Sequence, residues 1–152
     1  MSIWLFALFL AFFLQAGDIP AVAGDVFTSA EKAQIENANN VERRIKVYES
    51  ASRRLQQTLE TAVAKDEFQT VPENLKLWIT LLSKSLEDIE ANLKSKKKST
   101  ALIKYEIQVR KSIANSTSLK IKAPIEQQDL FDSCLAEAEK VREKFVEILF
   151  QH

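Results

Sequence analysis

The stretch TVPENLKLWITLLSKSLEDIEANL (residues 70–93) decides the fold. Its apolar residues recur at alternating steps of four and three, at Leu75, Ile79, Leu82, Leu86, Ile89 and Leu93. That spacing places one apolar stripe along a helix and is typical of helix-bundle and coiled-coil seams. Thr70 suits an N-cap, and Pro72 suits the first turn, where its missing N–H costs no hydrogen bond. The pattern predicts a helix from Thr70 to about Lys97.

Two further stretches carry a helical stripe. One contains Val41, Ile45, Tyr48, Leu55, Leu59 and Ala62, and the other contains Phe131, Cys134, Ala138, Val141, Phe145 and Ile148. Before the first, Thr28 with Glu31 and Asn39 with Glu42 each resemble a capping box. The segment ENANN (residues 36–40) is poor helix material, so this helix begins near residue 28 or breaks and restarts near residue 40. The last helix is expected over residues 125–150.

The segment at residues 101–122 is ambiguous. ALIKYEIQV (residues 101–109) alternates apolar and polar residues as a strand does, and LKIK (residues 119–122) could form the second strand of a hairpin. An isolated hairpin is only marginally stable, and no glycine turn joins the two runs. We therefore expect a helix over residues 99–119. Four amphipathic helices with short links predict an all-α protein, an antiparallel up-down four-helix bundle.

The N-terminus has the features of a targeting segment. IWLFALFLAFFL (residues 3–14) is an uncharged apolar run that is too short to span a bilayer comfortably, and AVA (residues 21–23) offers small residues for a signal peptidase. We expect a signal peptide at residues 1–23 and a single mature domain at residues 24–152, exported to the periplasm or the cell exterior. The alternative is a membrane anchor through residues 3–14.

The sequence lacks the residues of a catalytic or metal centre. Cys134 is the only cysteine and falls on an apolar stripe, while the only histidine, His152, is the last residue. A thiol nucleophile needs a base, and zinc needs several cysteine or histidine ligands. No phosphate-binding loop or hydrolase motif is present. We therefore expect no enzyme activity, no cofactor and no metal, with Cys134 in the core.

Two arginine pairs, Arg43-Arg44 and Arg53-Arg54, lie in the first helical stretch. On a helical wheel Arg43, Arg53 and Arg54 point away from the apolar stripe and Arg44 lies at its edge. Glu42 precedes Lys46 by four residues, and Glu49 precedes Arg53 by four, which is the favourable order for helical ion pairs. The pairs therefore indicate a solvated helix face. Arg43 and Arg54 lie on one side and remain weaker candidates for an anionic partner.

Uncompensated charge lies further along the chain. Residues 94–122 hold nine Lys and Arg against one Glu, whereas residues 126–152 hold seven acids against three bases. The last two helices could complement each other electrostatically. Alternatively, the basic stretch could bind an anionic membrane surface or acidic protein through Lys94, Lys96, Lys97, Lys98, Lys104, Arg110 and Lys111.

By elimination, the sequence favours a non-catalytic exported bundle that binds a protein partner or serves as a scaffold. A peripheral binder of anionic lipid or polymer, using residues 94–122, is the alternative. Nucleic acid is not expected, because no groove-reading motif is present and the protein is expected to be exported. Asn115 begins an N-glycosylation sequon, NST, whose use depends on the host. The sequence leaves the partner and the oligomeric state open.

Overall fold

The computed structural model describes residues 25–94 and 98–151, which fold into helices and no strand. Five α-helices and one 3-10 turn pack together: α1 (Ser29–Glu36), α2 (Val41–Ala64), η1 (Phe68–Thr70), α3 (Val71–Asn92), α4 (Thr100–Lys122) and α5 (Ile125–Phe150). The all-helical class is therefore correct, whereas the expected number of helices was one too low. The expected signal peptide or anchor lies outside the described residues. None of the described helices is long and apolar enough to cross a bilayer.

The additional helix results from a break at residues 37–40. Thr28 and Glu31 form the expected capping box at the start of α1. The second cap is Asn40 rather than the expected Asn39: the Asn40 side chain accepts a hydrogen bond of 2.9 Å from the backbone N–H of Arg43. Because Asn40 is in an extended conformation, the chain turns there and α2 begins as a separate helix.

The structure corrects the expected end of α3 and decides the conformation of the ambiguous segment at residues 101–122. α3 ends at Asn92, five residues before the expected Lys97, because Leu93 adopts an extended conformation (ψ 97°). Residues 101–122 are helical, which excludes the hairpin alternative. The side chain of Ser99 caps α4 by accepting a hydrogen bond of 3.1 Å from the backbone N–H of Leu102. Thr70 occupies the cap position of α3 without a side-chain capping bond, and its hydroxyl donates to the Glu67 carbonyl instead.

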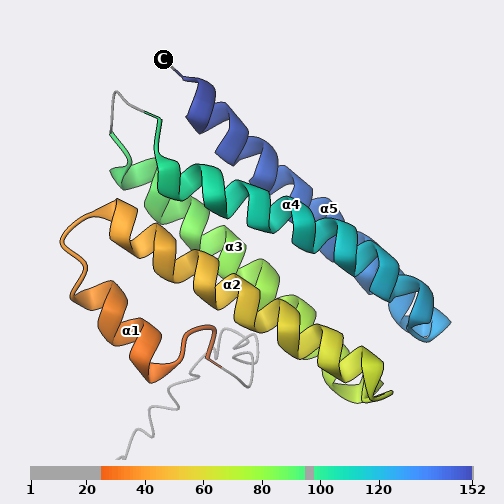
Figure 1. Cartoon of the computed structure of the whole chain (residues 1–152). Helices are drawn as coiled ribbons and strands as arrows, with labels where there is room; N and C mark the ends of the chain where they lie inside the picture. Colours follow the sequence, from red (N-terminus) through yellow and green to blue (C-terminus); the bar gives the residue numbers. More distant parts are fainter. Residues whose placement is uncertain (1–24, 95–97, 152) are drawn as a thin grey trace, which may run out of the picture.

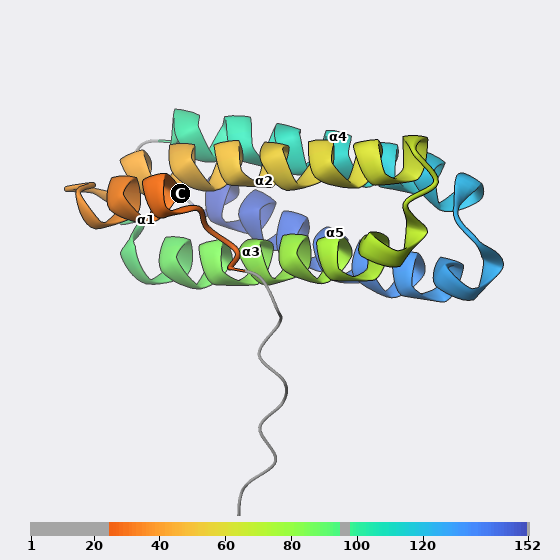
Figure 2. The same cartoon turned by 90° about the horizontal axis from the view of Figure 1, so that it is seen from below.

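The four long helices form two layers, one of α2 and α4 and the other of α3 and α5 (Figure 1, Figure 2). Cross-helix hydrogen bonds give their directions. Residue numbers rise together from the Glu42–Ser99 bond to the Gln56–Ser116 bond, so α2 and α4 are parallel. Between α2 and α3 the residue numbers run in opposite senses, from the Arg44–Asp88 bond to the Ser52–Trp78 bond. These two helices are therefore antiparallel.

The helices alternate in direction along the chain, but they do not follow chain order around the bundle. α2 packs beside α3 and α4, and α5 packs beside α3 and α4, while α3 and α4 lie diagonally opposite and meet through the buried hydrogen bond between the hydroxyls of Ser85 and Tyr105. Helices α3 and α4, which are consecutive in the chain, are therefore not adjacent in the bundle. Among the described helices, α1 packs beside α2 and lies on its outer side (Figure 1). This order makes α2 and α4 parallel neighbours and determines where the candidate site lies.

The buried core has two apolar clusters. The larger cluster includes Leu55 of α2 and Val109 of α4. The smaller cluster includes Leu59 of α2 and Leu119 of α4. Between these positions along the chain lie Gln56, Ser112 and Ser116, all buried. The apolar packing between α2 and α4 is thus interrupted by polar residues, several of them small. Cys134 is buried in the smaller cluster, as expected, and burial raises the pKa of its thiol.

Candidate functional site

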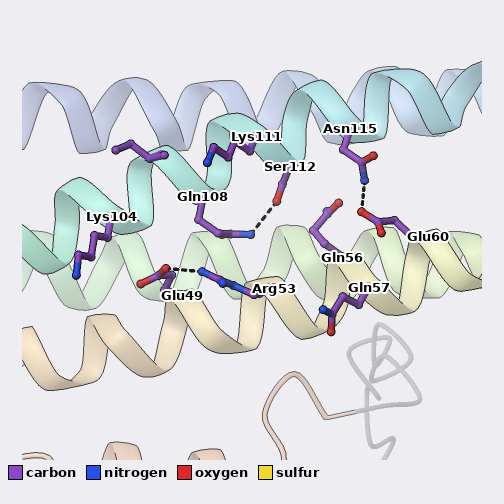
Figure 3. Close-up of a pocket in the computed structure, with 11 residues that line it drawn as sticks. Glu49, Arg53, Gln56, Gln57, Glu60, Lys104, Gln108, Lys111, Ser112 and Asn115 are labelled. Atoms are coloured by element: carbon purple, nitrogen blue, oxygen red, sulfur yellow. Dashed lines mark hydrogen bonds and ion pairs between the residues drawn. The ribbon is translucent and has the colours of Figure 1, made fainter.

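An open groove with a volume of about 480 Å³ lies between α2 and α4 (Figure 3). Each helix contributes a row of four polar residues at steps of four, three and four, which places each row on one helix face. The rows are Glu49, Arg53, Gln56 and Glu60 on α2, and Lys104, Gln108, Lys111 and Asn115 on α4. The amide of Asn115 donates to the carboxylate of Glu60, 55 positions earlier in the chain. This bond sets the two rows in register along the groove.

Two glutamine side chains lie in the groove with one end paired and the other end without a partner. Gln56 is 4% exposed, and its Oε1 accepts a hydrogen bond of 3.1 Å from Ser116. Gln108 donates from Nε2 to the hydroxyl of Ser112 at 2.8 Å. Gln56 Nε2 and Gln108 Oε1 are both buried and form no hydrogen bond in the structure. Such groups are rare in folded proteins and typically cost about 1–3 kcal/mol each.

The charged side chains of the groove differ in their pairing. Arg53 forms an ion pair of 2.7 Å with Glu49, one turn earlier on α2, as the sequence predicted. Lys104 and Lys111 form no ion pair within residues 25–94 and 98–151. They are two turns apart on one face of α4, so their backbones are about 10 Å apart along the helix. The groove therefore presents two uncommitted cations beside unpaired amide groups.

The structure separates the seven basic residues proposed from the sequence. Lys104 and Lys111 lie together in the groove. Arg110 lies 3.9 Å from Glu106 on the same helix, and Lys94 is exposed after the end of α3. Lys98 lies over the ring of Phe150, with its Nζ 4.7 Å from the ring centroid. Lys96 and Lys97 lie outside the described residues.

One arginine of each pair binds a carboxylate on another helix, which a simple solvated face would not require. Arg54 makes two hydrogen bonds of 2.9 Å to the carboxylate of Glu31 and one of 2.8 Å to the Val26 carbonyl, so it anchors α1 to α2. Arg54 points away from the four-helix core, as expected, but its face is not simply solvated, because α1 covers it. The guanidinium of Arg54 is therefore already bound, while Arg43 is exposed. The two do not form a joint anion site.

Arg44 binds a carboxylate on the neighbouring helix. Its Nε and Nη2 donate to Asp88 at 2.7 and 2.8 Å, and the hydroxyl of Tyr48 donates to the same carboxylate at 2.6 Å. Burial acts to raise the pKa of Asp88, but the hydrogen bonds from Arg44 and Tyr48 outweigh it, so this pKa lies below its usual range. Burial and the hydrogen bond to Asp88 raise the pKa of Tyr48. The three residues join α2 to α3 and leave no free charge for a ligand.

Glu42 does not pair with Lys46 as the sequence predicted. Its carboxylate instead accepts a hydrogen bond of 2.6 Å from the hydroxyl of Ser99, at the start of α4. This contact connects the first turns of two parallel helices. It also explains why the N-terminal ends of α2 and α4 lie side by side (Figure 2).

Charge is divided between the two layers. Helices α2 and α4 together carry ten Lys and Arg against four Glu, a net charge of +6, whereas α3 and α5 carry five bases against eleven acids, a net charge of −6. Lys120 and Asp132 connect α4 to α5 at 2.6 Å, in line with the expected attraction. A second ion pair, of 3.0 Å, joins Arg142 on α5 to Glu106 on α4, so here the base is on α5 and the acid is on α4. The layers therefore attract each other across the bundle.

The groove was not evident from the sequence, because it depends on which helices are neighbours. A local signal was nonetheless present: Ser52 and Gln56 on α2, and Ser112 and Ser116 on α4, are polar residues spaced by four beside the apolar stripes. Of these, Gln56 and Ser116 meet in a hydrogen bond between α2 and α4, whereas Ser52 accepts its hydrogen bond from Trp78 on α3. Within the described part of the chain, no group of three or more His, Cys, Asp or Glu residues is arranged to hold a metal ion.

Comparison of the chain with models of protein families, with curated proteins and with solved structures found no match. Function is therefore inferred from the groove itself.

Proposed function

We propose that this chain is an exported, non-catalytic bundle of four long helices, with α1 as a cover on α2, that binds a protein partner in the groove between α2 and α4. The observation that carries the proposal is the buried amide of Gln56, which has an unpaired Nε2 in a groove flanked by Lys104 and Lys111. A ligand that pairs these groups would remove a cost that the free protein bears. The lysines add a preference for negative charge.

The shape and chemistry of the groove favour a polypeptide over a small substrate. It follows each of the two helices over twelve residues, a rise of about 16 Å, and is open along its length. Its two carboxylates are already engaged, since Glu49 binds Arg53 and Glu60 binds Asn115. General acid–base chemistry needs a titratable group free to exchange a proton with a substrate. Binding without chemistry is therefore the function that these contacts support.

The experiment is a pull-down from the exported fraction of the native host. The chain is expressed from its full coding sequence with a C-terminal tag, so that any processing takes place. The groove variant is Lys104→Gln/Lys111→Gln. The matched control is Lys76→Gln/Lys84→Gln, which removes the same charge from exposed positions on α3.

We expect a partner that is captured by the native chain and by the control, and that is depleted at least tenfold with the groove variant. Equal capture by all three proteins would show that the groove is not the binding surface. Circular dichroism of each variant confirms that the helices are retained, so that loss of capture reports on the groove.

A second candidate, an anionic lipid surface, is favoured by one contact at the end of the bundle. Phe150 is 70% exposed and lies beneath the ammonium group of Lys98. An aromatic ring next to a lysine suits a membrane interface. Binding to vesicles that contain phosphatidylserine should weaken sharply as salt rises. Vesicle binding that is the same at low and high salt would exclude the electrostatic lipid mechanism.

A further inference from the structure

We infer that the α2/α4 groove takes an extended peptide segment that carries two carboxylates three residues apart. The inference rests on the proposed function and names the chemistry of the partner. It follows from the order of groups along the two helices: a lysine, an amide, a lysine and an amide on α4, facing the buried amide of Gln56 on α2.

The unpaired amide groups match the backbone of an extended chain. Gln56 Nε2 is a donor and Gln108 Oε1 is an acceptor, and they are contributed by facing helices. Every residue of a peptide other than proline offers one C=O and one N–H, so a single extended segment could pair with both. A helical ligand could not, because its backbone groups are already bonded within the helix. The amides in the groove thus favour an extended ligand of any sequence.

The lysines add the requirement for acidic side chains. Lys104 and Lys111 are seven residues apart, about 10 Å along the axis of α4. A chain in the polyproline II conformation rises about 3.1 Å per residue and repeats every three, so side chains three apart lie on one face about 9 Å apart. Two carboxylates at that spacing would each reach one lysine. The groove length of about 16 Å accommodates roughly five extended residues.

The acids of the groove restrict where negative charge can be placed. Glu49 lies at the Lys104 end and Glu60 at the Asn115 end (Figure 3). A uniformly anionic polymer would place charge beside Glu60, whose partner Asn115 is neutral, and be repelled there, whereas the charge of Glu49 is compensated by Arg53. A segment with two acids at a fixed spacing avoids this repulsion. The geometry therefore points to a spaced acidic motif rather than to a continuous polyanion.

The test uses fluorescein-labelled, proline-rich nine-residue peptides and fluorescence anisotropy at low salt. One peptide has two glutamates three residues apart, the second has glutamines at the same positions, and the third has the two glutamates adjacent. For the full chain we expect the first peptide to bind about tenfold more tightly than the other two. Equal affinity for the first and second peptides would overturn the inference.

Two groove variants separate the contributions of lysine and amide. Lys104→Gln/Lys111→Gln should remove the preference for glutamate, so that the first two peptides bind alike. Gln56→Met keeps the side-chain volume and should weaken both peptides by the same factor, about fivefold. The control Lys76→Gln/Lys84→Gln should bind all three peptides as the native chain does. A glutamate preference that survives in the groove lysine variant would contradict the role of these lysines.

The outcomes also distinguish this inference from the proposed function. If the peptides show no preference while capture of the native partner still requires Lys104 and Lys111, the groove binds a protein and the extended acidic motif is wrong. If partner capture is also unaffected by the groove variant, the proposed function fails as well.

Discussion

Asp66 replaces the glycine that often ends a helix. Its backbone has a positive φ of 57°, and the N–H groups of Asp66 and Glu67 bond to the carbonyls of Val63 and Ala62 in a Schellman motif. The sequence has no glycine after Gly24, so an aspartate, which tolerates this conformation better than most residues, takes the position. The chain therefore builds its α2–α3 turn at some cost in backbone strain.

Replacing Asp66 by glycine should relieve this strain. We expect Asp66→Gly to raise the free energy of unfolding by about 0.5–1 kcal/mol, since glycine adopts the left-handed region freely. Asp66→Ala should lower it, because alanine tolerates a positive φ less well than aspartate. Urea titration followed by circular dichroism measures both values. A glycine variant less stable than the alanine variant would contradict the described turn.

The contact between Asp88 and Arg44 predicts a dependence of stability on pH. The folded-state pKa of Asp88 is lowered, so the unfolded state binds a proton first as pH falls. Its stabilisation is therefore fully present above the ordinary aspartate pKa near 4 and is lost as pH falls toward the lower folded value.

We expect Asp88→Asn to cost about 1–3 kcal/mol in the free energy of unfolding at pH 7. The difference from the native chain should shrink as pH falls below 4. Urea denaturation of both proteins at pH 7 and pH 3 gives the comparison. An equal difference at the two pH values would mean that Asp88 is not ionised in the contact.

At the scale of the element, α1 depends on a polar anchor. It has no buried residue of its own, and its attachment to α2 includes the hydrogen bonds of Arg54 to Glu31 and Val26. The neighbouring arginine, Arg53, is 61% exposed and pairs only within α2. The two adjacent residues therefore have different structural roles and provide a matched pair of variants.

Arg54→Met should release α1 from the bundle while leaving the four long helices folded. We expect amide hydrogen exchange in α1 to rise about tenfold or more, because a contact with charged hydrogen bonds is lost. Arg53→Met should leave the exchange of α1 unchanged. If both variants protected α1 equally, Arg54 would not be its anchor.

Helix positions were largely predictable from the sequence, because the stripes through residues 70–93 and 131–148 have a period that only a helix satisfies. The end of α3 was not predictable, because the lysines after Leu93 are good helix formers and the local sequence gives no reason for the helix to stop there. The strand-like alternation at residues 101–109 was overridden by packing: Leu102, Tyr105 and Val109 are all buried, at helical spacing. Tertiary contacts decided what local patterns left open.

At the scale of the whole molecule, helix order could not be predicted. Short links suggest that consecutive helices are neighbours, yet α3 and α4 lie diagonally opposite each other in the bundle. Two of the basic residues picked out by charge alone, Lys104 and Lys111, lie in the groove. Their partners in the groove, Gln56 above all, became visible only once α2 and α4 were seen to be parallel neighbours.

The opposite charges of the two layers predict that salt lowers stability. Sodium chloride should screen the attraction between the +6 and −6 layers, reducing the free energy of unfolding on the order of 1 kcal/mol between low and physiological ionic strength. Urea, which is uncharged, is the suitable denaturant. Stability that is constant or rises over this range would show that the attraction between layers is negligible.

The most direct test of the groove as a docking surface is photo-crosslinking in the native host. A benzoylphenylalanine placed at Gln57, an exposed position that lines the groove, is compared with one at Glu87, which is exposed on the α3/α5 side. We expect a partner to be crosslinked from position 57 and not from position 87, and the crosslink to disappear with Lys104→Gln/Lys111→Gln. Crosslinking from position 87 alone, or a crosslink at position 57 that persists without the two lysines, would contradict binding in the α2/α4 groove.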